Sequence, residues 1–139
     1  MSQPKDKFDF ELFFNALADR TRLRILNLLG EDEVCVCFFV EVLDTNQPKI
    51  SRHLAYLRRA GIVETRKEGL WMHYRVEEPK NEDARRIWQG VKIYLSNDKE
   101  MQKDRKRLVK VCCADKLPAS VEGAPIPASL AKIQCSVKC

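Results

Sequence analysis

The chain has 139 residues, 45% of them hydrophobic, with a formal net charge of +5 at pH 7 and a pI of about 8.9. These values are typical of one compact domain with a short appendage, and the positive charge favours a polyanionic partner. The chain begins without an apolar signal segment, and no stretch approaches the ~20 apolar residues of a membrane span. The sequence therefore predicts a cytoplasmic protein with no membrane partner. In a reducing compartment, its six cysteines are more often thiols or metal ligands than disulfides.

Three helices are predicted in the first third of the chain. Aromatic and apolar residues recur at helical spacing within residues 8–18. Asp19 is a suitable N-cap for a second helix, which Gly30 closes. After an acidic connector, the segment VCVCFFVEVLD (34–44) predicts a short third helix with an apolar face toward the core.

Residues 46–61 predict a fourth helix with two unlike faces. Asn46 is a good N-cap, Pro48 is tolerated in the first turn, and Gly61 ends the helix. One face is apolar and consists of Ile50, Leu54 and Leu57. The opposite face carries Lys49, Arg52, Tyr56 and Arg59, with Ser51 on the flank. Such a helix suits a DNA major groove, although an ordinary amphipathic helix with a solvated basic face gives the same pattern.

The pattern changes to strand alternation over residues 62–76, with Glu68-Gly69 at the tip of a predicted hairpin. Leu70, Met72, Tyr74 and Val76 are expected on one face, and Trp71, His73 and Arg75 on the other. Trp71 and His73, on the outer face of the hairpin, are expected to hold it against its neighbours, while Arg66 and Lys67 contact phosphates. A basic hairpin behind a basic helix is a wing, so the predicted fold class is mainly α with a β-hairpin, a winged helix-turn-helix.

Pro79 breaks the chain before another predicted helix over residues 81–95, which a highly charged stretch follows. We assign residues 1–96 to a DNA-binding and dimerisation domain and residues 97–139 to an extension. From Ala114 onward, three prolines and small residues predict a flexible tail.

This order of elements, with CVC in one helix, QPKISRHL in the next and GLWMHYRV in the wing, resembles the ArsR/SmtB family of metalloregulators over residues 10–95. EVCVC resembles the ELCVC box of the arsenic- and cadmium/lead-sensing branches. The resemblance implies a repressor that is a homodimer through its first and last helices, near 8–18 and 81–95, and that leaves double-stranded operator DNA when an inducer binds. It implies DNA contacts from Gln47, Lys49, Ser51, Arg52 and His53. Because His53 lies ~60° from the apolar stripe, a packed role is as well supported as a base contact.

Soft thiolates select thiophilic ions, so Cys35 and Cys37 are candidate ligands for As(III), Sb(III) or other thiophilic metal ions. On a regular helix these two residues diverge by ~200°, so they can converge only if Cys35 precedes the first turn or if that turn unwinds. Cys35 has an N-cap-like position, where a thiol pKa is expected to be lowered. We hypothesise that chelation distorts this turn and thereby the helix that carries residues 47–59. Buried structural cysteines are the alternative.

The third sulfur of an arsenic site is not evident. In the arsenic sensors that the box resembles, a third cysteine follows at CVCxxC, where this chain has Val40. Cys112 and Cys113 are the favoured partners, and they resemble an adjacent pair in the last helix of another branch, although packing explains them equally well. Cys135 and Cys139 are less favoured, because a flexible tail loses more entropy on reaching a site. A two-thiolate site for a methylated arsenical is a further alternative.

The leading interpretation is an arsenite- or antimonite-responsive repressor. A cadmium, lead or methylarsenite sensor, or a dithiol redox or persulfide switch, could use the same fold. An enzyme is not expected, because no histidine follows His73 to activate a downstream cysteine and no phosphate-binding glycine loop or HExxH motif occurs. A module whose basic helix binds protein would differ from a DNA reader in its weaker salt dependence.

Overall fold

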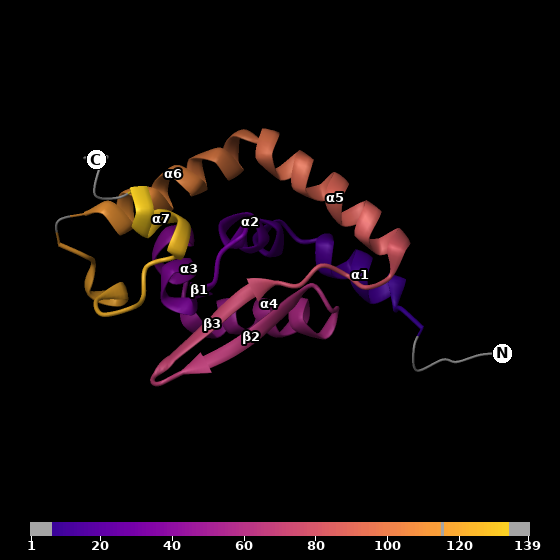
Figure 1. Cartoon of the computed structure of the whole chain (residues 1–139), viewed down its shortest axis with the longest axis horizontal. Helices are drawn as coiled ribbons and strands as arrows, with labels where there is room; N and C mark the ends of the chain where they lie inside the picture. Colours follow the sequence, from indigo (N-terminus) through magenta and orange to yellow (C-terminus); the bar gives the residue numbers. More distant parts are fainter. Residues whose placement is uncertain (1–6, 115, 134–139) are drawn as a thin grey trace.

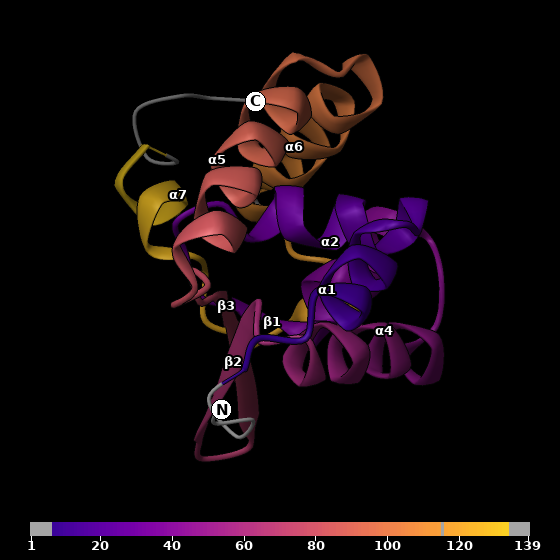
Figure 2. The ribbon, with the colours of Figure 1, turned by 90° about the vertical axis from the view of Figure 1, so that its right-hand side faces the viewer.

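The computed structural model describes residues 7–114 and 116–133, with side chains as far as residue 130. Its elements are α1 (Phe10–Leu17), α2 (Arg20–Leu29), β1 (Val34–Cys35), α3 (Val36–Leu43), α4 (Gln47–Arg59), β2 (Val63–Glu68), β3 (Trp71–Val76), α5 (Glu82–Asn97), α6 (Lys99–Cys113), η2 (Ala119–Val121) and α7 (Ala128–Ile133). In Figure 1, α5 and α6 form an arch over α2, and the small sheet and α4 lie on the other side of α2. Figure 2 shows the β2–β3 hairpin projecting away from the helices beside α4. The predicted fold class, a winged helix-turn-helix, is confirmed.

Side-chain caps fix where the helices begin. Asp19 accepts a hydrogen bond from the amide of Arg22 at 3.0 Å, and Asn46 accepts one from the amide of Lys49 at 3.0 Å. Both were predicted caps, and each satisfies an amide that has no partner within its helix. Asp9, Asn81 and Asp98 cap α1, α5 and α6 in the same way.

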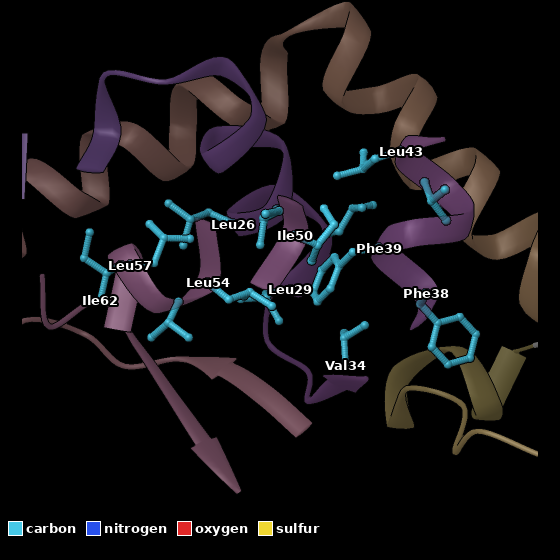
Figure 3. Packing of buried hydrophobic residues seen from close by; sticks show 14 of the residues in the cluster. Leu26, Leu29, Val34, Phe38, Phe39, Leu43, Ile50, Leu54, Leu57 and Ile62 are labelled. Atoms are coloured by element: carbon cyan, nitrogen blue, oxygen red, sulfur yellow. The ribbon is translucent and has the colours of Figure 1, made fainter. Parts of the chain in front are cut away.

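The orientation of α4 is set by its apolar stripe. Ile50, Leu54 and Leu57 have no exposed surface. They point toward buried residues of α2 and α3, among them Leu26, Leu29 and Phe39 (Figure 3). Burying each side chain of this size contributes about 1.5–3 kcal/mol. This packing turns the polar face of α4 outward, as the sequence predicted.

The wing contains a third strand that the sequence did not reveal. The sheet has the antiparallel order β1-β3-β2, and β1 pairs Cys35 with His73. One predicted orientation is wrong, because His73, expected on the outer face, is 5% exposed and has β1 beside it. Leu70, grouped by the alternation with Met72, Tyr74 and Val76, lies in the turn before β3 and is 93% exposed. The expectation that His73 holds the hairpin against its neighbours is confirmed.

Residues 116–133, which we call the strap, lie against α3 and the end of α6. Val121, Ala124 and Leu130 are buried, so the predicted low order is wrong for this segment. Ser129 donates its amide and hydroxyl to the Asp32 carboxylate at 3.1 and 2.5 Å, and the Ser120 hydroxyl donates to Glu41 at 2.6 Å. The strap is therefore attached just before α3 and again near its end. Cys135 and Cys139 lie outside the described residues.

Within the two described segments, none of the helices is both long enough and apolar enough to span a lipid bilayer. The boundary assigned at residue 96 stays a prediction. α6, which follows it, packs on α2 and α3.

Replacing Ser129 with alanine should lower the free energy of unfolding by about 1–2 kcal/mol, because a buried carboxylate loses a hydrogen-bond donor. Urea denaturation measures this change. Ser120→Ala is the matched control, because its partner Glu41 is more exposed, and its loss should stay within about 0.5 kcal/mol. Equal losses of unfolding free energy in the two variants would show that the hydrogen bond to Asp32 stabilises the fold no more than the one to Glu41 does.

Candidate DNA interface and cysteine site

The outward face of α4 carries most of the predicted DNA contacts. Gln47, Lys49, Arg52 and Arg59 are exposed, and Ser51 is half-buried at the edge of this face. Arg58, which the sequence analysis did not single out, is also exposed in the last turn. Its position beside Arg59 is the signal that could have identified it. Lys49, Arg52, Arg58 and Arg59 make this exposed face of α4 cationic.

Tyr56 does not point freely outward. The guanidinium groups of Arg22 and Arg59 each lie over its ring, with their central carbons 4.2 and 4.9 Å from the ring centroid. Arg22 is fixed in turn by hydrogen bonds to the carbonyls of Ala16 and Asn15 at 2.9 and 2.8 Å. Cation–π contacts of this kind contribute about 0.5–2 kcal/mol. Tyr56 thus joins α4 to α2 and positions Arg59.

His53 has a packed position. Its Nδ1 atom lies 3.4 Å from an Arg22 nitrogen and 4.0 Å from an Asp19 oxygen. Burial lowers the pKa of His53, with Arg22 and Arg52 acting in the same direction and Asp19 opposing them. Of the two roles that the sequence supported, the structure shows the packed one.

The two predicted phosphate contacts of the wing differ in their surroundings. Arg66 donates two hydrogen bonds to Glu33 at 3.0 and 2.7 Å and pairs with Glu68 at 3.2 Å. The Arg66 guanidinium lowers the pKa of the Glu33 carboxyl. Lys67 is exposed near the tip. A phosphate would have to compete with Glu33 for Arg66, whereas Lys67 is open to solvent.

Cys35 ends β1 and is the N-cap of α3, with extended backbone angles of φ −77° and ψ 149°. It therefore precedes the first helical turn, as the sequence suggested. Its Sγ atom lies 3.6 Å from His73 Nδ1, and both residues are buried. Cys37 is half-buried in the first turn of α3.

Burial makes both thiols weak acids. It raises the pKa of Cys35 to about 12, with a smaller contribution from the nearby Cys37. Burial also raises the pKa of Cys37, against backbone hydrogen bonds that lower it. The expectation that the helix N-terminus lowers the Cys35 pKa is wrong, because loss of solvent outweighs the field of a short helix. A bound ion must therefore displace protons from both sulfurs.

Cys112 and Cys113 lie in the last turn of α6, which packs against α3. Cys112 is 2% exposed, and burial raises its pKa to about 12, while Cys113 is half-buried. Across residues 7–114 and 116–133, no three histidine, cysteine or carboxylate side chains are arranged to hold a metal ion. The structure therefore does not bring the four candidate cysteines together in one preformed site.

Residues 19–65 match the model of a family described as bacterial regulatory protein, arsR family. A homodimeric winged helix-turn-helix DNA-binding domain from Mycobacterium bovis is 30% identical, with a TM-score of 0.52, and the match covers 65% of this chain and 81% of that one. The chain belongs to the arsR family.

Two curated relatives in this arsR family differ in what their names say they respond to. The arsenical resistance operon repressor of Escherichia coli K12 is 56% identical over 64 residues, which are 45% of this chain and 55% of that protein. A cadmium resistance regulatory protein of Listeria innocua is 36% identical over 69 residues, 49% of this chain and 58% of that protein. The chain thus spans little more than half the length of these relatives.

Cys35 should be alkylated by iodoacetamide near neutral pH at least ~100-fold more slowly than an ordinary cysteine, because the rate follows the thiolate fraction. The raised pKa also means that the rate should keep increasing as the pH rises to ~10. Peptide mass spectrometry after short labelling measures the rate at each cysteine, and labelling in urea is the control. A rate that levels off near pH ~8.5 would contradict the raised pKa.

Proposed function

We propose that this chain is an arsenite- or antimonite-responsive transcriptional repressor. It binds operator DNA as a homodimer and leaves the DNA when cysteine thiolates capture the ion. The observation that carries the proposal is the position of Cys35 and Cys37 at the start of α3, the helix that leads directly into α4. The match to a family of regulatory proteins supports a regulator rather than an enzyme.

The DNA contacts follow from the exposed face of α4. Arg52 and Lys49 suit base edges or phosphates in the major groove, and Lys67 suits a phosphate next to it. The wing projects beside α4, so both elements can meet one duplex (Figure 2). The net charge of +5 supports association with a polyanion.

A second copy of the chain is the proposed partner of α1 and α5. Phe14, Ile93 and Tyr94 are 49%, 64% and 48% exposed on these helices, although large apolar side chains are usually covered. The Mycobacterium bovis relative is homodimeric, which supports the same assembly here. A dimer would read two half-sites separated by one or two turns of DNA, at ~34 Å per turn.

The release mechanism is local. For both sulfurs to reach one ion, Cys37 must turn toward Cys35, which distorts the first turn of α3. Because α3 packs against α4 through buried residues such as Phe39, the distortion reaches the DNA-reading helix (Figure 3). A coupling free energy of about 1–3 kcal/mol would change operator affinity by ~5- to 150-fold.

Cadmium or lead sensing is a second candidate, and the similarity to a cadmium resistance regulator favours it. The same two thiols could also take a methylated arsenical or act as a redox or persulfide switch. Operator release measured against arsenite, Cd²⁺, Pb²⁺ and an oxidant separates these functions.

Arg52→Ala should weaken operator binding by about 1–3 kcal/mol if Arg52 contacts a base. Fluorescence anisotropy with a labelled operator measures the affinity, and footprinting shows whether two half-sites are protected. Arg107→Ala is the matched control, since Arg107 is exposed on α6, distant in sequence from α4. Wild-type binding should also weaken steeply with salt. Binding insensitive to both the substitution and salt would indicate a protein partner instead.

Cys35→Ser and Cys37→Ser should each abolish operator release by arsenite, because each removes one of the two thiolates that distort the first turn of α3 when they chelate the ion. Both variants should still bind DNA, since neither side chain belongs to the DNA-facing surface. Cys112→Ser and Cys113→Ser test for a third sulfur, and loss of release in either identifies the donor. If Cys35→Ser releases the operator at the same arsenite concentration as the wild type, Cys35 is not an inducer ligand.

A further inference from the structure

We propose that His73 of the wing is a metal ligand. Together with Cys35 and Cys37, it forms a mixed nitrogen–sulfur site for a divalent cation of the Zn²⁺ or Cd²⁺ type. The proposal rests on the proposed function in one respect, since it takes Cys35 and Cys37 as the inducer-binding pair. It adds a donor from a different element and a different class of ion.

The spacing of the first two donors fits a metal ion. Antiparallel pairing places Cys35 of β1 directly opposite His73 of β3, and their Sγ and Nδ1 atoms are 3.6 Å apart. Zinc bonds sulfur at ~2.3 Å and imidazole nitrogen at ~2.0–2.1 Å. At a tetrahedral angle, two such ligand atoms are separated by ~3.5–3.6 Å. The pair therefore has the separation of neighbouring ligands without any backbone movement.

The other ring nitrogen of His73 faces a carboxylate. Nε2 lies 3.4 Å from Glu68 Oε1, and in the part of the chain that the structure describes it has no hydrogen-bond partner. Metal-binding histidines almost always donate their second N–H to a carboxylate, carbonyl or water. A cation on Nδ1 would make Nε2–H a stronger donor and draw Glu68 closer. His73 is thus oriented as a ligand, with its supporting carboxylate nearby.

Cys37 is the third donor of the proposed site. Cys35 is the N-cap of α3 and Cys37 lies in the first turn of the same helix, so both sulfurs belong to the start of α3. Because residues 7–114 and 116–133 hold no ready-made cluster of three donors, Cys37 has to turn toward the pair. Its partial exposure gives an ion access to the buried Cys35 and His73. Binding releases the thiol protons of both cysteines to solvent.

The donor set determines which ions fit. Imidazole suits Zn²⁺ and related divalent ions, whereas thiolates alone suit the softest ions. The start of α3 offers two sulfur ligands, from Cys35 and Cys37, and His73 supplies the third ligand atom. Because His73 belongs to β3, a bound dication would also fix the wing to the start of α3, which arsenite held by sulfur alone would not do.

X-ray absorption spectroscopy of the reduced full chain with one equivalent of Zn²⁺ tests this proposal. The spectrum should show sulfur together with the outer-shell scattering of one imidazole. The chain has two histidines, which gives a matched pair of variants. His73→Gln should lose the imidazole scattering, whereas His53→Gln should keep it. Glu68→Gln should keep the imidazole but weaken Zn²⁺ binding about 10- to 100-fold.

An all-sulfur spectrum in the wild-type protein would overturn the proposal without reliance on any variant. Imidazole scattering that disappears in His53→Gln but not in His73→Gln would also overturn it. Arsenite-driven operator release, measured on the same proteins, separates the two proposals. If arsenite still releases the operator but the Zn²⁺ spectrum shows only sulfur ligands, the proposed function stands and the His73 site is excluded. If an imidazole is coordinated but arsenite does not release the operator, the His73 site is established and the proposed function is excluded.

Discussion

The backbone of Cys35 is part of both the wing sheet and the start of α3, so the arrangement of the wing relative to α4 depends on it. As the last residue of β1 it is hydrogen-bonded into the wing sheet, and as the N-cap of α3 it begins the helix that packs on α4. Burial of Val34 and Phe38 on either side of this junction holds it in place. Cys35 therefore connects the wing sheet to α3, which packs on α4.

The same burial decides how the thiols can respond. A helix N-terminus carries about half a positive charge, which favours a thiolate, but burial of an ionisable group shifts its pKa by up to several units in the opposite direction. For Cys35, which is 1% exposed, burial dominates and the sulfur stays protonated near neutral pH. Only a ligand whose bonds to sulfur offset the loss of the protons can bind. Burial thus makes Cys35 slow to react with alkylating reagents, and under the proposed function it would favour thiophilic ions over other ligands.

Local signals in the sequence predicted most of the frame. The caps Asp19 and Asn46, the apolar stripe of α4 and the alternation of the hairpin each depend on neighbours in the chain. β1 could not be predicted, because two residues have no period and their pairing with β3 joins positions 38 residues apart. The packing of the strap could not be predicted either, because its hydrogen bond between Ser129 and Asp32 joins residues 97 positions apart in the chain. The candidate cysteines were evident, whereas the closeness of His73 to Cys35 needed the fold.

The strap limits how α3 can move, which bears on any response to an ion under the proposed function. It is attached to Asp32 before the helix and to Glu41 near its end, so shifting α3 as a rigid body would break contacts at both points. The part-buried contact with Asp32 contributes about 1–2 kcal/mol and the more exposed contact with Glu41 less, and their sum is comparable with the coupling free energy of the proposed function. Rearranging only the first turn leaves Glu41 undisturbed, and Cys37 lies in that turn. Under the proposed function, a local change at the start of α3 would therefore cost less free energy than a rigid-body shift of the helix.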